Sequence, residues 1–403
     1  KATKESHSYR GRLTLSGPFH TGRTLLYPQR ELLPNQSDWH TFYPAQSYCL
    51  PEGIVYLDGQ ENSVVLGTVD IIKYMGHGVW KEVQTIPISF NQNQKNSELR
   101  FLLSDTQSGL IRFWGVISND PLVNWKSETD VSTIQIADLN QTRKLWLDGV
   151  YDIVPDSYFP TDPRGFWRCP AQHVGKSFLS ANSRFTYAIA VSSMYGSINT
   201  QNEAGYWPTG PLSNWLAEDY DFSYNFYDTR FNTDAALYLL EAYRKYGEDK
   251  ALDSAFRYSD FLCSFAQESA YRTKNGGYLV PDYQDSSGRH KTHTSLNHLL
   301  AEMNFLYEIY LTTGNRKCMN IAEKMLLAVK DTCNEWIKDT GELWYARLPN
   351  GDYGLEDYPT LTLKDLRHSQ QLISQIYGRR DPDLARLISS KEAYNRANGL
   401  PLW

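Results

Sequence analysis

Three helix–turn–helix stretches in the second half of the chain constrain its fold more than any other feature. Each consists of an apolar-periodic segment, a glycine, a charged turn and another periodic segment, with Gly247, Gly314 and Gly378 at the turns. The glycines lie roughly 65 residues apart, a spacing compatible with a structural repeat. A single helical hairpin cannot bury its apolar face, so repeated hairpins must stack. The pattern predicts an incomplete α/α toroid whose loops at one end carry the chemistry.

The segment 227–247 shows the helical pattern most clearly. Its apolar residues recur at three and four positions, which is one face of an α-helix. Arg244 and Lys245 favour the negative end of the helix dipole, and Gly247 is a typical stop residue.

The segment ahead of this helix, residues 205–226, is packed with aromatic residues, proline and glycine. It has too many turn residues for a helix and too many aromatic residues for a plain linker. Sugar C–H faces stack on aromatic rings, so such a loop suits a carbohydrate groove. Trp207, Trp215 and Tyr220 are the candidates for sugar stacking, and core packing is the alternative.

Residues 1–140 are predicted to form a β-rich sandwich or sheet module. Short β-branched and aromatic runs, bounded by turn residues, extend through the run STIQIADL at 132–139. The interval 105–109 is expected to connect a hairpin. Residues 141–225, interrupted by several prolines, form an aromatic bridging segment, and residues 226–403 form the toroid. The fold class is therefore α+β with several domains.

The composition narrows the function. Of the 403 residues, 14% are aromatic, an excess common in sugar-active proteins and in large secreted β-rich proteins. The formal net charge of −6 argues against a nucleic-acid-binding surface, so an anionic substrate needs a local cluster of cationic side chains. The five cysteines show no metal-binding spacing, and neither a metal nor another cofactor is predicted.

The start of the chain suggests a location outside the cell. It begins at Lys1 in a polar segment, as expected where a leader has been removed, and two glycosylation sequons begin at Asn35 and Asn140. We expect an extracellular or cell-surface protein. The sequence leaves open whether the protein forms a homodimer.

Several ordered motifs in residues 200–380 resemble those of the D-glucuronyl C5-epimerases of heparan-type polysaccharides. They are GYWP at 205–208, NFYDTRFNTDAALYLLEAY at 225–243, SLNHLLAEMNFLYEIYLTTGN at 295–315, DTGELWYARL at 339–348 and RHSQQLISQIY at 367–377. The resemblance implies a β-rich part followed by an α/α barrel, acting on a polysaccharide that contains uronic acid. The implied reaction removes the C5 proton of a glucuronic acid residue and replaces it from the opposite face, which requires two acid/base groups.

The resemblance also implies the catalytic positions. The family's Glu–Tyr pair corresponds to Asp282 and Tyr283, and its tyrosine after Asp-Thr-Gly corresponds to Tyr345. A further family tyrosine aligns with Lys364 without a gap, and with Tyr358 if a few residues are inserted. A tyrosine needs nearby cations to act as an acid/base group near neutral pH.

Other residues are predicted to bind the substrate. Arg289, Lys291 and Arg347 supply positive charge near Tyr345, and His368 lies in the last matching motif. His293 is expected to bind substrate or cap a helix rather than join His290 and His298 in a metal site. Tyr227 and Arg230, at helical spacing, suit a sugar carboxylate. Equally, Arg230 pairs with Asp234 as an ordinary surface ion pair.

Two alternatives stay open. An α/α-barrel lyase or hydrolase acts on similar polymers, and a hydrolase requires a carboxylate pair, drawn from Asp219, Asp221, Asp228, Asp282 and Glu356. The mismatch at Lys364 also allows a non-catalytic carbohydrate-binding relative.

Overall fold

The computed structural model describes residues 8–26, 38–104, 109–146, 148–285, 288 and 291–402. The contacts divide the chain into two compact units, Lys1–Ser197 and Ile198–Trp403. This boundary falls inside the predicted bridging segment 141–225, and the division into 1–140, 141–225 and 226–403 stays a prediction. Within the described ranges, no helix is both long enough and apolar enough to span a bilayer.

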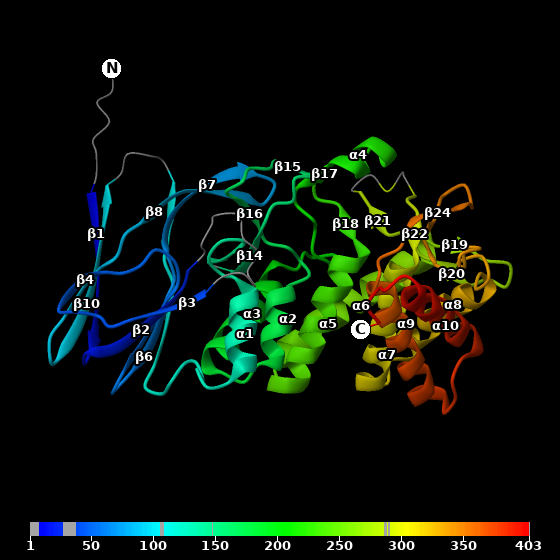
Figure 1. The fold of residues 1–403 in the computed structure, drawn as a ribbon. Coiled ribbons are helices and arrows are strands. Elements are labelled where there is room, and N and C mark those ends of the chain that lie inside the picture. Colours follow the sequence, from blue (N-terminus) through cyan, green and yellow to red (C-terminus); the bar gives the residue numbers. More distant parts are fainter. Residues whose placement is uncertain are drawn as a thin grey trace, which may run out of the picture. The chain divides into compact units, whose positions relative to one another are not determined.

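Antiparallel sheets dominate the first unit (Figure 1). A four-stranded sheet has the order β1 (Ser8–Ser16), β10 (Asn96–Ser104), β9 (Ser89–Gln92), β4 (Ser47–Cys49). A five-stranded sheet has the order β12 (Gly115–Ser118), β6 (Ser63–Leu66), β5 (Val55–Gly59), β2 (Phe19–Leu26), β3 (Asp38–Phe42). A six-stranded sheet has the order β11 (Leu110–Arg112), β7 (Val69–Gly76), β8 (Val79–Ile86), β16 (Gly165–Trp167), β14 (Gly149–Ile153), β13 (Arg143–Trp146). The short strand β15 (Tyr158–Phe159) also belongs to this unit.

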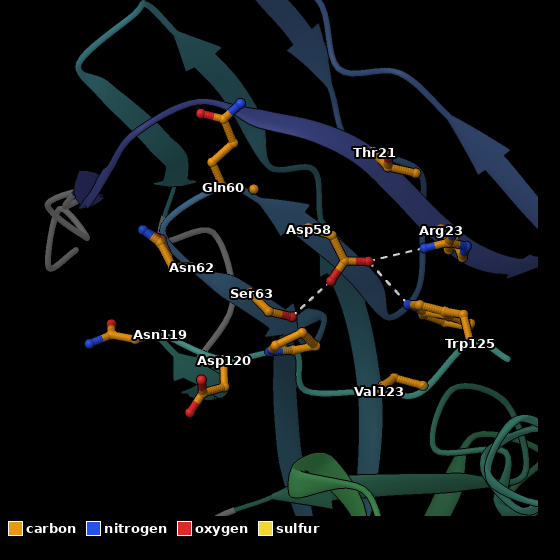
Figure 2. Close-up of a pocket in the computed structure, with 12 residues that line it drawn as sticks. Thr21, Arg23, Asp58, Gln60, Asn62, Ser63, Asn119, Asp120, Val123 and Trp125 are labelled. Carbon is orange, nitrogen blue, oxygen red and sulfur yellow. Dashed lines mark hydrogen bonds and ion pairs between the residues drawn. The ribbon is translucent and has the colours of Figure 1, made fainter. Parts of the chain in front are cut away.

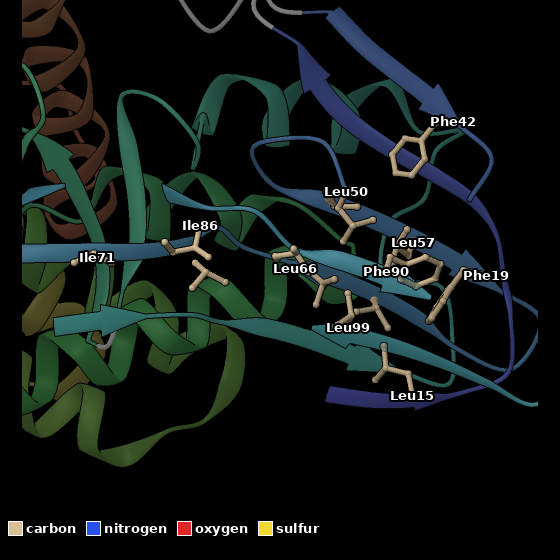
Figure 3. Close-up of a cluster of buried hydrophobic side chains, with 14 residues drawn as sticks. Leu15, Phe19, Phe42, Leu50, Leu57, Leu66, Ile71, Ile86, Phe90 and Leu99 are labelled. Atoms are coloured by element: carbon tan, nitrogen blue, oxygen red, sulfur yellow. The ribbon is translucent and has the colours of Figure 1, made fainter. Parts of the chain in front are cut away.

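One apolar cluster joins side chains from all three sheets (Figure 3). Leu99 of β10 and Phe90 of β9 come from the four-stranded sheet, and Leu57 of β5 from the five-stranded sheet; all three are fully buried. Ile71 of β7 adds a side chain from the six-stranded sheet. Burying apolar faces against one another is the dominant stabilising term for antiparallel sheets of this kind.

One prediction about the first unit is wrong. Most of the run 132–139 lies in helix α1 (Glu128–Ala137) rather than in a strand, because Ser127 caps the helix by accepting from the Asp130 amide at 3.2 Å. The interval 105–109, expected to connect a hairpin, lies outside the described residues except for Gly109. Among the described residues, β10 pairs with β1 and β9, and β11 pairs with β7.

Helices are present in both units. The first unit also contains α2 (His173–Ser180) and α3 (Arg184–Thr200), the latter extending to the boundary. The helices of the second unit are α4 (Asn214–Tyr220), α5 (Thr229–Tyr246), α6 (Asp249–Ser269), α7 (Leu296–Thr313), α8 (Arg316–Asp331), α9 (Leu361–Tyr377) and α10 (Pro382–Ala397) (Figure 1). Its short strands are β17 (Leu212–Ser213), β18 (Tyr227–Asp228), β19 (Tyr271–Arg272), β20 (Tyr278–Leu279), β21 (Tyr283–Gln284), β22 (Thr294–Ser295), β23 (Trp344–Arg347) and β24 (Tyr353–Glu356).

The helices of the second unit stack as hairpins in two layers. The first members α5, α7 and α9 contact one another in sequence, and so do the second members α6, α8 and α10. Gly247, Gly314 and Gly378 end the first members with left-handed backbone conformations, φ 70°, 75° and 70°. Glycine adopts this conformation at little cost, which is why the three glycines mark the turns. Two layers of hairpins are the arrangement that the sequence predicts for an incomplete α/α toroid.

Replacing Gly314 by Ala should lower the stability of the α7–α8 hairpin by about 1 kcal/mol. A Cβ built on Gly314 meets no atom of the described residues within 4 Å, so the cost comes from the backbone conformation alone. Hydrogen exchange of the α7 and α8 amides measures the change. Lys324→Ala, at an exposed position of α8, is the control, and faster exchange of equal size in both variants would contradict the explanation.

Candidate active site

Asp282 links the N-terminal ends of two neighbouring helices in the second unit. Its backbone oxygen accepts a hydrogen bond from the Thr229 amide at the start of α5, at 3.0 Å. Its side-chain Oδ1 accepts from the amide of Ser295, the residue before α7, at 2.7 Å. The side chain of Asp282 is fully buried. Helix N-termini carry partial positive charge and unsatisfied N–H groups, so a carboxylate is stabilised there.

Two buried histidines lie beside the other oxygen of this carboxylate. Oδ2 of Asp282 is 3.3 Å from His293 Nε2 and 3.6 Å from His298 Nδ1. His298 Nδ1 is also 2.8 Å from the hydroxyl of Thr229. Burial lowers the pKa of His298 to about 4, so its imidazole is neutral at neutral pH. Burial alone would raise the pKa of Asp282, but His298, His293 and the contact with Ser295 hold it below its usual value.

From His293 the line of contacts continues to a partly exposed tyrosine. The hydroxyl of Tyr220, at the end of α4, is 3.0 Å from His293 Nδ1. Tyr220, His293 and Asp282 therefore form a phenol–imidazole–carboxylate line from the surface to the two helix ends. We call these three residues the Asp282 relay. An imidazole that touches a hydroxyl on one side and a carboxylate on the other is the arrangement of an oriented general base.

Aromatic rings surround His293. The ring centroids of Trp215, Tyr283 and Tyr345 lie 5.8, 5.8 and 5.9 Å from that of the imidazole. Tyr345 is brought there by β23, which pairs with β22 next to His293. Burial raises the pKa of Tyr345, and Asp282 adds to the effect, so its phenol is protonated at neutral pH.

The four residues predicted to be catalytic thus lie in one continuous cluster. Asp282 contacts His293 directly, and Tyr283 and Tyr345 contact its ring. Tyr358, 52% exposed, packs edge-on against Tyr345 at 5.8 Å between centroids. The structure thus brings the four residues together, and their roles in catalysis stay a prediction.

Two cations lie at one edge of this cluster. The Lys291 ammonium is 5.3 Å and the Arg347 guanidinium carbon 5.9 Å from the ring centroid of Tyr271. Burial and neighbouring Tyr220 raise the pKa of Tyr271 to about 12, while Arg347 opposes the shift. Positive charge is therefore available beside Tyr271, and a role for it in binding an anionic sugar stays a prediction. Arg289 and His290, also considered in the sequence analysis, lie outside the described residues.

Other residues predicted to bind substrate have structural partners instead. Trp207 is 2% exposed, and its backbone exchanges two hydrogen bonds with the Asn232 side chain, at 2.6 and 2.9 Å. Tyr227 is also 2% exposed, with its hydroxyl 3.0 Å from that of Tyr258. Neither ring presents a face for a sugar in this structure, because both are enclosed in the helical core. The geometry of Trp207 therefore favours core packing over sugar stacking.

Arg230 and His368 both have carboxylate partners. Arg230 lies 3.1 Å from Asp234 and 2.6 Å from Asp365, so the ion pair considered as its alternative role is present. His368 Nε2 lies 3.0 Å from Glu308. A sugar carboxylate would have to compete with these carboxylates for either side chain.

Two further buried carboxyl groups lie near the relay: Asp228, considered above for a hydrolase, and Glu302, which sequence reasoning missed. Asp228 caps α5 by accepting from the Phe231 amide at 2.9 Å. Burial raises the pKa of Asp228 to about 7, and Asp282 adds to the shift. Glu302 of α7 is fully buried, and burial raises its pKa well above the usual value. Asp before Thr229 is a recognisable capping signal, but nothing in the sequence marks Glu302 among the apolar residues of α7. Within the described part of the chain, no group of three His, Cys, Asp or Glu side chains is arranged to hold a metal ion.

No family model and no curated protein matches this sequence. Solved structures resemble it in part. A glycoside hydrolase family 76 mannosidase from Bacteroides thetaiotaomicron has 15% identity and a TM-score of 0.44, over 60% of this chain and 64% of that one. A family 76 glycoside hydrolase from a bovine strain of the same species has 12% identity and a TM-score of 0.48, over 84% and 76%. A cellobiose 2-epimerase from Spirochaeta thermophila has 15% identity and a TM-score of 0.42, over 57% and 59%.

The chain thus spans less than two thirds of the length of the mannosidase. These neighbours include both hydrolases and a sugar epimerase. No functional inference is drawn from likenesses of this size.

Asp228→Asn should flatten the dependence of stability on pH between about pH 4 and pH 7. The folded-state pKa of Asp228 is raised from 3.8 to about 7, so its contribution is fully present below pH 4 and is lost as the pH rises to 7. A shift of this size corresponds to about 4 kcal/mol. Asn caps helices as well as Asp does, so the variant keeps the cap and removes the titration.

Thermal or urea unfolding at several pH values measures this difference. Asp253→Asn, an exposed carboxylate of α6, is the matched control and should leave the pH dependence as it is in the parent chain. Parallel pH profiles for the parent and Asp228→Asn would contradict the assignment.

Proposed function

We propose that this protein is a carbohydrate-active enzyme that inverts C5 of a uronic acid residue within a polysaccharide. The observation that carries the proposal is the Asp282 relay, which ends at the partly exposed hydroxyl of Tyr220. The ordered motifs that resemble those of the glucuronyl C5-epimerases support the same reaction. The proposed partner is a polymer, since the proposed reaction takes place within a polysaccharide chain.

The chemistry requires a base on one face of the sugar ring and an acid on the other. We assign the base to Tyr220 with His293, because His293 Nδ1 can take the phenol proton while its Nε2 faces the Asp282 carboxylate. We assign the acid to Tyr345, whose raised pKa keeps its proton in place until the carbanion forms. The base removes the C5 proton, and the Tyr345 hydroxyl donates a proton to the opposite face. Exchange with solvent then restores both groups.

The carboxylate of the sugar accumulates negative charge as the C5 proton leaves, and cations lower the energy of that state. Lys291 and Arg347 lie beside the ring of Tyr271, which neighbours Tyr220. The chain has an overall negative charge and so offers no general attraction for a polyanion. Binding of the uronate carboxylate therefore requires local cations, and we assign that role to Lys291 and Arg347.

A hydrolase fits the same residues less well. It needs two carboxyl groups that reach the glycosidic bond. Asp282 is enclosed at the ends of α5 and α7, and Asp228 is engaged as the cap of α5. Both carboxyl groups are thus used to hold the helix ends. A lyase uses the same C5 base without the second proton donor, and it is distinguished by its product.

Incubation with a glucuronic-acid-containing polysaccharide in deuterated water tests the proposal. Solvent deuterium should appear at C5, with the chain length unchanged and without unsaturated ends. Unsaturated ends would assign a lyase, new saturated reducing ends a hydrolase, and binding without any of these a non-catalytic protein. Each of the three would overturn the epimerase.

Tyr345→Phe and Tyr220→Phe should each lower the rate of deuterium incorporation by about 100-fold or more, because each removes one acid/base group. Tyr377→Phe is the matched control. Tyr377 lies at the C-terminal end of α9, and its hydroxyl donates to Glu323. The rate of deuterium incorporation in this variant should equal that of the parent. An unaltered rate in either active-site variant would remove that residue from the mechanism.

A further inference from the structure

A polar pocket of about 310 Å³ lies in the first unit, remote in sequence from the relay (Figure 2). Its walls come from β2, the β5–β6 turn and the segment 119–125. Most of its lining side chains are polar, and Pro121, Val123 and Trp125 form a small apolar wall. The resemblance to the epimerases does not reach these residues, so the function proposed above leaves the pocket unexplained.

The centre of the pocket is a carboxylate held by three donors. Asp58 Oδ1 accepts from the Ser63 hydroxyl at 2.9 Å. Its Oδ2 accepts from Arg23 Nη1 at 3.0 Å and from Trp125 Nε1 at 3.1 Å. The guanidinium of Arg23 lies over the Trp125 ring, 4.4 Å from its centroid. The three bonds fix Asp58 and Arg23 in place before any ligand arrives, which reduces the entropic cost of binding.

Both fixed groups retain capacity for a ligand. A carboxylate offers about four lone-pair positions and a guanidinium five N–H donors. The bonds to Ser63, Arg23 and Trp125 occupy three of the positions on Asp58, and the ion pair occupies one donor of Arg23. An acceptor and several donors are thus held side by side, a combination that suits neighbouring hydroxyl groups.

The charges of the pocket indicate a neutral ligand. Arg23 is offset by Asp58, and Asp120 pairs with Arg184 at 2.6 Å. No excess positive charge is left for a phosphate, sulfate or uronate group. The polar lining is equally unsuited to an apolar peptide. The volume is at the lower end of the range for small-molecule sites, about 300–1,000 Å³, which limits the ligand to a few rings.

We propose that this pocket binds a neutral sugar residue, with Asp58 and Arg23 bonded to its hydroxyls and the Trp125 wall against its C–H groups. The proposal goes beyond the epimerase reaction and does not depend on it. A polymer in which neutral sugars accompany uronic acids would offer ligands to both places.

The proposal is tested by titrating the full chain with cellobiose, maltose and N,N′-diacetylchitobiose. Binding is measured by calorimetry and by saturation-transfer NMR. A glucuronic-acid-containing disaccharide is titrated in parallel. At least one neutral disaccharide should bind saturably. Arg23→Gln and Asp58→Asn should each weaken that binding by about tenfold, the effect of losing one good hydrogen bond. Absence of binding by all three neutral disaccharides, or binding of the acidic one alone, would overturn the proposal.

If a substitution at the centre of the pocket unfolds the first unit, variants at the rim of the pocket still test the proposal. Gln60 lines the pocket and is exposed, so Gln60→Ala should fold normally and weaken binding severalfold. Gln94→Ala, in another exposed turn of the same unit, is the matched control with unchanged binding. Equal affinities for Gln60→Ala and Gln94→Ala, together with unchanged binding in whichever central variant folds, would place the sugar elsewhere. Because no deuterium exchange is measured, the result is separate from the test of the epimerase.

Discussion

The second unit depends on one buried carboxylate that joins two helix ends. Asp282 accepts from the first amide of α5 through its backbone and from the amide before α7 through its side chain. Removing its side chain would leave the buried Ser295 amide without its acceptor, at a cost of about 1–3 kcal/mol, and would take away the carboxylate beside His293 and His298. Because the same carboxylate faces His293, helix capping and the orientation of a candidate base depend on one residue. Stability and the proposed chemistry are therefore coupled at Asp282.

The features that the sequence predicted well are those fixed by local chemistry. Gly247, Gly314 and Gly378 are identifiable because a left-handed residue at a helix end strongly favours glycine. The periodic segments between them predict the helices for the same local reason. The resemblance located Asp282 and Tyr345, and the structure places both within one aromatic cluster. Local signals and motif order thus predicted the helical hairpins and part of the candidate site.

The features that the sequence did not predict depend on contacts between distant residues. Tyr220 and His293 are 73 positions apart, and they meet only because short strands pair between the helices. Residues 132–139 have β-branched character, yet the cap at Ser127 starts a helix there. Trp207 belongs to a segment whose composition suits a sugar groove, but composition cannot distinguish an exposed ring from a buried one. Tertiary packing decided each of these cases against the local preference.

The Asp282 relay and the Asp58 pocket differ in charge for a physical reason. Around the relay, Lys291 and Arg347 lie beside the ring of the partly exposed Tyr271, and the buried carboxylate of Asp282 is stabilised at the helix ends. In the pocket of the first unit, each cation has its own carboxylate. A developing anion is stabilised only where positive charge remains uncompensated, so proton abstraction from a uronate suits the relay. Hydroxyl recognition needs fixed donors and acceptors rather than net charge, and the Asp58 pocket provides them.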